Sequence, residues 1–340
     1  MTTLVVLGAG ASRGASFPIG TSVDCLPPLN ADFFTQLQRI TSDKHSRIIK
    51  RVVQDVVRLF GANFSLTLED YFTQLEFLNR TIGLVGRNPD FRQEGLATQR
   101  QNLMAALAAV LEASTDRAIK EGGCLFHARL VQALGMQDTI VSFNYDCLID
   151  DALRRHGDNK WNARWGYHFP LATHDVVGGE HWDPDLPARS RSNCVALLKP
   201  HGSLNWQVSE SQVRLKQRLH AQRGVPMFTI IPPGWHKGVE DSDVFGWIWR
   251  EAARRIRSAD VIVIVGFSFV ATDLQAESLF RLALRKSGPL KRLVIVNPSG
   301  ETRYRIRSIF EVPLATGNVL VRQFETFGDF VDSLPAGVRR

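Results

Sequence analysis

Short apolar runs recur along the chain and predict buried β-strands. Most of them lack alternating polar residues, which is typical of parallel strands that are covered on both faces. The predicted strands are Leu4–Leu7, Thr139–Phe143, Val195–Lys199, Met227–Ile231, Val261–Val265, Leu293–Val296 and Val319–Phe324. Amphipathic stretches between the later strands predict helices at 244–258 and 272–286, the second opening with the good N-cap types Thr272 and Asp273. This alternation indicates an α/β, Rossmann-like doubly wound, mainly parallel sheet.

Residues 28–135 interrupt the alternation, because their periodicity is helical throughout. Helical patterns cover Ser46–Phe60, 68–78 and 102–114, and we expect an exposed loop at 85–100. No second strand follows the first one at the usual distance. The sequence therefore predicts an inserted helical subdomain.

The predicted domain division follows from that insertion. We expect residues 1–27 and 136–340 to form the Rossmann-like domain, and residues 28–135 to form the insert. Residues 157–193 are rich in Trp, His, Pro and Gly and are long for a connection, so we expect them to cover a site.

Composition narrows the class of protein. The chain has 340 residues, with 44% hydrophobic and 22% charged, as in soluble globular proteins. No apolar run approaches the roughly 18 residues of a membrane span, and the N-terminus lacks the features of a signal peptide, so we expect a cytoplasmic protein without membrane contact. The four cysteines form no CxxC pair, which argues against a disulfide framework or a cysteine zinc site.

The net charge of +7 comes partly from arginines in the last third, as in "WREAARRIR" and "GETRYRIRSIF". Such clusters can meet nucleic acid or an acidic partner, but they are more often solvated helix faces. We do not expect direct binding of nucleic acid.

The first strand leads into a glycine turn, "LGAGAS", in which Gly8, Ala9, Gly10 and Ser12 precede a helix. Close-set glycines after a strand let the backbone approach a pyrophosphate. The spacing up to Gly14 is one residue longer than in dehydrogenases, and the second strand with its ribose-binding acid is missing. The turn therefore favours nucleotide binding without redox chemistry, although tight strand–helix packing alone would also require glycines.

Three further strand ends carry polar or small residues. "SFNYD" places Asn144 and Asp146 at one end, where Asp146 could contact a ligand or simply cap the next helix. "KPHGSLNW" places His201 at another, where a histidine can serve as a general base, although a lone histidine is more often structural. Small or polar residues also follow two later predicted strands. Gly266 and Ser268 come after Val261–Val265, and Asn297 comes after Leu293–Val296.

The order of these motifs resembles the sirtuin family over about residues 3 to 300. "SFNYD", "KPHGSLNW" and "VGFSF" are similar to the prokaryotic sirtuin-like branch of antiphage defence systems. The resemblance implies a Rossmann-type domain and NAD as a consumed substrate. It also implies that Gly8, Ala9, Gly10 and Ser12 hold the pyrophosphate and a ribose.

The same resemblance implies roles for the remaining site residues. Asn144 would place the attacking water, Asp146 would lie beside the nicotinamide, and His201 would act as the base. The adenosine half would be lined by Gly266, Ser268 and Asn297. Deacylating sirtuins carry a four-cysteine zinc module after the His-Gly motif, whereas residues 205–226 contain no cysteine. We expect no metal, since the spacing of His156, His168, His174 and His181 matches no compact ligand set.

Three functions fit these observations. The first is an NAD glycohydrolase that releases nicotinamide and ADP-ribose and depletes NAD in abortive infection. The resemblance implies that a partner protein of the same system or a nucleotide signal holds such an enzyme in check, and that it works as a homo- or hetero-oligomer. The alternatives are a non-catalytic nucleotide sensor or assembly subunit, and an NAD-dependent protein deacylase, against which the absent zinc module counts.

Overall fold

The computed structural model describes residues 1–17, 25–85, 93–217, 228–233, 243–270, 273–285 and 288–335. Its centre is a six-stranded sheet of order β11-β10-β9-β1-β2-β4, in which every neighbouring pair is parallel. The strands are β1 (Thr3–Leu7), β2 (Thr139–Ser142), β4 (Ala196–Leu198), β9 (Val261–Val265), β10 (Arg292–Val296) and β11 (Leu320–Phe324). When these six strands are numbered 1 to 6 in chain order and the sheet is read across from β4, their order is 3-2-1-4-5-6. This is the Rossmann order. The predicted fold class is confirmed.

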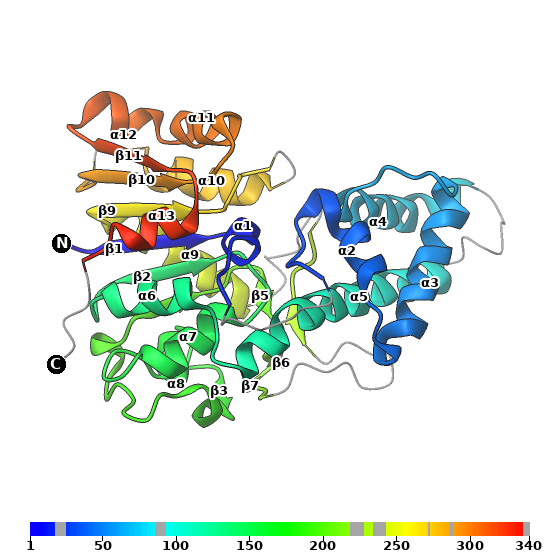
Figure 1. Ribbon diagram of the computed structural model, residues 1–340, viewed down its shortest axis with the longest axis horizontal. Coiled ribbons are helices and arrows are strands. Elements are labelled where there is room, and N and C mark those ends of the chain that lie inside the picture. The colour runs from blue at the N-terminus through cyan, green and yellow to red at the C-terminus, as the bar shows by residue number, and fades with distance from the viewer. Residues whose placement is uncertain are drawn as a thin grey trace.

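Helices cover both faces of the sheet, as its unbroken apolar strands require. On one face α6 (Leu125–Ala133) packs against α7 (Leu148–His156) and α13 (Phe327–Asp332). On the other face α10 (Leu274–Ala283) packs against α9 (Asp243–Ser258) and α11 (Gly300–Ile309), as Figure 1 shows. Between these layers β1, β2, β4 and β9 are almost completely buried. The double cover explains why the strand sequences show no alternation.

The helices of the insert stand beside the sheet rather than on it (Figure 1). The 3-10 turn η1 (Asn30–Asp32) leads into the insert, whose longest helix, α5 (Gln93–Lys120), contacts the three others. These are α2 (Phe33–Arg39), α3 (Asp43–Phe60) and α4 (Leu68–Val85). The helix α6 packs instead on the helix layer of the sheet. The predicted division of the chain, with the insert at residues 28–135, stays a proposal.

One local prediction is wrong, and one predicted strand pairs outside the main sheet. Residues 93–100 of the expected loop belong to α5, because Leu96 is buried by helical packing; residues 86–92 lie outside the described residues. The run at 227–231 adds no strand to the main sheet. Its described part forms β8 (Thr229–Ile230), which pairs antiparallel with β5 (Gly202–Ser203).

Residues 157–193 form short elements that pack over the β4 edge of the sheet. They include α8 (Ala163–Gly166), β3 (Asp175–Val177), η3 (Gly179–Trp182) and η4 (Arg191–Asn193). Here β3 pairs with β7 (Gln212–Leu215), which also pairs with β6 (Trp206–Val208). The remaining helices are α1 (Ala9–Arg13), after β1, and α12 (Glu311–Thr316), before β11. No helix among the described residues is long and apolar enough to span a membrane.

Candidate active site at the switch point of the sheet

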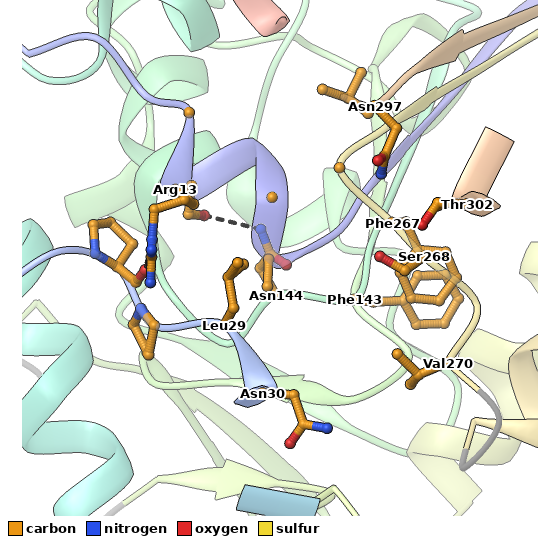
Figure 2. Close-up of a pocket in the computed structure, with 18 of the residues that line it drawn as sticks. Arg13, Leu29, Asn30, Phe143, Asn144, Phe267, Ser268, Val270, Asn297 and Thr302 are labelled. Carbon is orange, nitrogen blue, oxygen red and sulfur yellow. Dashed lines mark hydrogen bonds between the residues drawn. The ribbon is translucent and has the colours of Figure 1, made fainter. Parts of the chain in front are cut away.

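A cavity of about 730 Å³ opens at the carboxyl ends of the central strands. The chain order of the strands reverses between β1 and β9, and the loops that leave these two strands diverge there to form a crevice. The cavity volume lies within the range of about 300 to 1,000 Å³ that small-molecule sites occupy. Figure 2 shows Arg13, Leu29 and Asn30 on one side and Phe267, Ser268 and Asn297 on the other, with Asn144 between them.

The glycines at the crevice allow the ends of β1 and β9 to touch. A Cβ added to Gly8 would lie 2.5 Å from the Cα of Phe267, and one added to Gly10 would lie 2.7 Å from the Cα of Gly266. The N–H groups of Gly8 and Gly10 donate to the carbonyls of Val265 (3.0 Å) and Gly266 (2.9 Å). The glycines of the turn therefore serve close packing, which brings the ends of β1 and β9 together at the cavity floor.

Gly266 itself has φ = 60°, in the left-handed region that favours glycine. A Cβ there would lie 2.2 Å from the backbone nitrogen of Ala11. This residue is thus required both for its conformation and for its close approach to α1.

A chain of hydrogen bonds fixes the amide of Asn144. Its Nδ2 donates to the carbonyl of Gly8 and to Oγ of Ser12, both at 2.9 Å. The Ser12 hydroxyl donates in turn to Oδ2 of Asp146 at 2.6 Å, while Oδ1 of Asp146 accepts from the backbone N–H of Leu148 at 3.0 Å. Asp146 therefore accepts from the first N–H of α7, one residue before the N-cap Cys147, and orients Ser12 at the same time.

The direction of this chain leaves one group of Asn144 for a ligand. The Ser12 hydroxyl gives its only hydrogen to a carboxylate and must accept from its other neighbour, and the Gly8 carbonyl is also an acceptor. The Asn144 amide can satisfy both only with its NH₂ group turned toward them. Oδ1 is then what Asn144 can offer to a water or a hydroxyl group in the cavity.

His201 lies in the same cavity wall, beside aromatic rings. Its ring centroid is 5.0 Å from that of Phe143, and Phe143 stacks on Phe267 at 4.3 Å. The imidazole Nε2 lies 3.8 Å from Oδ2 of Asp273, and both side chains are buried. A buried imidazole with a carboxylate beside it is a plausible proton acceptor.

A buried ion pair holds the two strand ends that carry these groups. Nζ of Lys199 donates to Oδ2 of Asp150 (2.9 Å), to the carbonyl of Asp146 (2.7 Å) and to Oγ of Ser203 (2.6 Å). Burial alone would lower the pKa of Lys199. The attraction of nearby acidic groups, of which Asp150 contributes most, is larger, so the pKa of Lys199 is raised. The cation therefore connects the loop of Asn144 to the loop of His201.

The insert supplies the facing wall of the cavity. Asn30 donates to Glu69 at 3.1 Å and accepts from the backbone N–H of Glu69 at 2.9 Å, which joins η1 to the start of α4. Arg13 on α1 donates to the carbonyl of Pro27 at 2.6 Å and forms an ion pair with Asp32. Leu107 and Leu111 of α5 complete the apolar part of this wall.

The structure gathers the residues that the sequence singled out. Of the predicted site residues, all but Gly8 line the cavity: Ala9, Gly10, Ser12, Asn144, Asp146, His201, Gly266, Ser268 and Asn297. Gly8 lies directly behind the wall, where its carbonyl accepts from Asn144. Residues 157–193, which we expected to cover a site, contribute no residue to this cavity wall.

Two charged residues of the cavity wall, Arg13 and Asp273, were not predicted as site residues from the sequence. Asp273 appeared only as an N-cap, which it also is, since Oδ1 accepts from the N–H of Ala276 at 3.3 Å. Its position shortly after "GFS" was the signal that could have drawn attention to it. Arg13 carried no signal, because its partners Pro27 and Asp32 approach it only through the tertiary fold. Among the described residues, no group of three or more His, Cys, Asp or Glu side chains is placed to hold a metal ion.

The fold and the cavity together define a Rossmann-like α/β protein with a ligand cavity at its switch point, walled on one side by an inserted helical subdomain. No known family model and no curated protein matches the chain. Among solved structures, the chain is similar to a mutant of a Sir2 homologue in complex with ADP-ribose. The sequence identity is 15% and the TM-score 0.37, over 72% of this chain and 76% of the other. Since this likeness is weak, the fold class rests on the topology of the sheet.

Proposed function

We propose that the chain is an NAD glycohydrolase, which cleaves the nicotinamide–ribose bond and gives nicotinamide and ADP-ribose. The observation that carries this proposal is that Oδ1 of Asn144 and the imidazole of His201 face one cavity at the switch point, where Rossmann-like proteins bind nucleotides. The resemblance of the motifs to sirtuins supports NAD as the substrate. The cavity size also suits a ligand of this class.

The chemistry needs few groups. Cleavage of the N-glycosidic bond passes through an oxocarbenium-like centre, as in glycoside hydrolysis. Nicotinamide leaves from a cationic ring as a neutral molecule, so the site needs no strong general acid. Asn144 accepts a hydrogen bond from the attacking water and fixes its position, and His201 takes a proton from that water or from a ribose hydroxyl. The balance is NAD⁺ and water to nicotinamide, ADP-ribose and one proton.

The remaining residues bind the two halves of the dinucleotide. In this proposal Gly8, Ala9, Gly10 and Ser12 lie along the pyrophosphate and the nearby ribose, and Asp146 lies beside the nicotinamide. The adenosine half lies along Gly266, Ser268 and Asn297. The positions of Ala9, Gly10 and Ser12 in the cavity wall support this arrangement, and Gly8 lies directly behind them.

Uncontrolled hydrolysis of NAD would harm the cell that makes the enzyme. We therefore propose, from the motif resemblance, a cytoplasmic effector of an antiphage abortive-infection system. A partner protein or a nucleotide signal would release its activity, within a homo- or hetero-oligomer. NAD is then a substrate, and no metal takes part.

The test is the release of nicotinamide from NAD by the purified chain, alone and together with the product of the neighbouring gene. Asn144→Ala and His201→Ala should each lower kcat by at least about 100-fold. Asn193→Ala and His181→Ala change the same residue types at exposed positions and should leave turnover unchanged. Equal turnover in all four variants, or no turnover under any condition, would contradict the hydrolase.

Two results would select the alternatives. Binding of NAD without turnover would indicate the nucleotide sensor or assembly subunit. Nicotinamide release that depends on an added acyl-lysine peptide would indicate the deacylase.

A further inference from the structure

The carboxylate of Asp273 lies against the imidazole of His201 inside the cavity. Their side chains are only 5% and 6% exposed, and Oδ2 of Asp273 is 3.8 Å from Nε2 of His201. The other oxygen, Oδ1, accepts from the backbone N–H of Ala276 at the start of α10. This second contact fixes the carboxylate and directs Oδ2 toward the ring.

Among the described residues, three aromatic rings surround the imidazole. Phe143 and Trp249 place their ring centroids 5.0 and 6.1 Å from it, and Tyr145 lies at 6.2 Å. The Tyr145 hydroxyl donates to the carbonyl of Ile231 at 2.8 Å. Burial, with smaller contributions from Asp273 and Glu69, raises the pKa of Tyr145 well above its usual value, so this neighbour stays neutral.

Charged residues elsewhere in the cavity wall belong to other elements. Arg13, Glu69, Asp146 and Glu325 come from α1, α4, the β2–α7 connection and the β11–α13 connection. Arg13 pairs with Asp32, Glu69 bonds Asn30, and Asp146 accepts from Ser12. Among the described residues of the cavity wall, Asp273 is therefore the carboxylate at ion-pair distance from His201.

We propose that Asp273 is a positioning residue for His201: its carboxylate orients the ring in the cavity and stabilises the positive charge that the ring acquires on accepting a proton. The proton comes from the attacking water or the ribose hydroxyl and returns to solvent after the products leave. A shift of about 0.8 Å would bring the two atoms to hydrogen-bond distance, and such contacts often tighten when substrate binds. The kinetic consequence rests on the proposed hydrolase, whereas the pairing itself does not.

The pairing is tested without substrate by NMR titration of His201 in the full chain. The His201 resonance is assigned from its loss in His201→Gln. In Asp273→Asn the midpoint of its titration should fall by about one pH unit, because an opposite charge no longer stabilises the imidazolium. Asparagine retains an oxygen for the N–H of Ala276, so α10 keeps its cap. Asp183→Asn is the matched control, since Asp183 also accepts a backbone N–H at a helix start, from Ala163 at 2.7 Å.

Kinetics provide the second measurement. Asp273→Asn should lower kcat by about 100-fold, change KM by less than about threefold, and move the acidic limb of the pH–rate profile to lower pH. Asp273→Glu restores the charge and should recover part of kcat. An unchanged titration midpoint in Asp273→Asn would overturn the inference, whether or not the chain hydrolyses NAD. Absence of turnover in the wild-type chain would overturn only the proposed hydrolase, and the titration would still decide the pairing.

Discussion

At the scale of single residues, the site depends on the direction of hydrogen bonds and on close backbone contacts. The Asn144 amide has two N–H donors and one carbonyl acceptor, and the hydrogen bonds through Ser12 to Asp146 determine that the carbonyl oxygen remains for the cavity. Gly266 has no side chain at all, and its positive φ and its contact with α1 allow the ends of β1 and β9 to meet. Both residues act through geometry that a similar side chain would not reproduce.

Gly266→Ala should lower the free energy of unfolding by about 2 to 4 kcal/mol, because the new Cβ meets backbone atoms in a left-handed conformation. Thermal or denaturant unfolding measures this change. Gly300→Ala is the matched control, since a Cβ at Gly300 would meet its nearest neighbour, a guanidinium nitrogen of Arg303, at 3.9 Å. Equal stability of the two variants would show that the β1–β9 contact is looser than described.

At the scale of elements, the segment 157–193 is attached to the sheet domain through a buried histidine. His168 lies between two guanidinium groups: Arg191 donates to its Nδ1, and Arg255 lies at its Nε2, both at 3.4 Å. Burial, then Arg191 and Arg255, lower the pKa of His168 to about 3. The histidine that appeared in the sequence as one of four possible metal ligands is instead a neutral contact between this segment and α9.

The pH dependence of stability follows from that shift. Because the pKa of His168 is lower in the folded chain, the unfolded chain binds a proton below pH 6.5 that the folded chain does not bind. The free energy of unfolding should therefore decrease as the pH falls from about 6.5 to about 3, by up to about 1.4 kcal/mol per pH unit for one proton.

Denaturant unfolding at several pH values measures this slope, and His168→Gln should reduce it between pH 6 and 5. In that range Glu251, whose pKa is lowered to about 2, is ionised in both states and contributes little. His181→Gln, at an exposed position, is the control. The same slope in His168→Gln as in the wild type would assign the proton to another group.

At the scale of the whole molecule, the cavity belongs to two parts of the chain. The sheet supplies the polar groups at its carboxyl edge, and the insert supplies Leu29, Asn30, Leu107 and Leu111 on the facing side. The ion pair of Arg13 with Asp32 and the contacts of Asn30 with Glu69 hold this facing side in place. Ligand affinity should therefore depend on the insert as well as on the sheet.

If the chain binds ADP-ribose as the proposed function requires, Leu111→Trp should lower that affinity by at least about tenfold, because a larger side chain on α5 occupies part of the cavity. Calorimetric titration measures the affinity. The stabilisation of the fold by the ligand is a second measure, about 2.7 kcal/mol at 100 times Kd. Leu186→Trp, at an exposed position, is the control. Unchanged affinity in a folded Leu111→Trp variant would show that the ligand does not reach the wall formed by the insert.

Much of this molecule follows from its sequence. Mainly apolar runs predicted the strands of the main sheet, because strands covered on both faces need apolar residues at most positions. The edge strand β11, which contains Arg322 and Gln323, is largely exposed. Polar residues directly after those runs predicted the site, because parallel strands bring their carboxyl ends to one edge. The run at 227–231 contains the strand β8, which pairs antiparallel with β5 instead of joining the main sheet, and composition does not distinguish the two kinds of pairing.

The tertiary structure decided the rest. Three contacts of the site join segments that are distant in the chain or separated by turns. They are the hydrogen bond of Asn144 with Ser12, the pairing of Asp273 with His201, and the ion pair of Arg13 with Asp32. Such contacts depend on how loops and helices approach one another, and a periodic pattern of apolar residues carries no information about that approach. The sequence by itself determined the sheet and the edge at which the cavity opens, and the packing of the insert and the loops determined which atoms line that cavity.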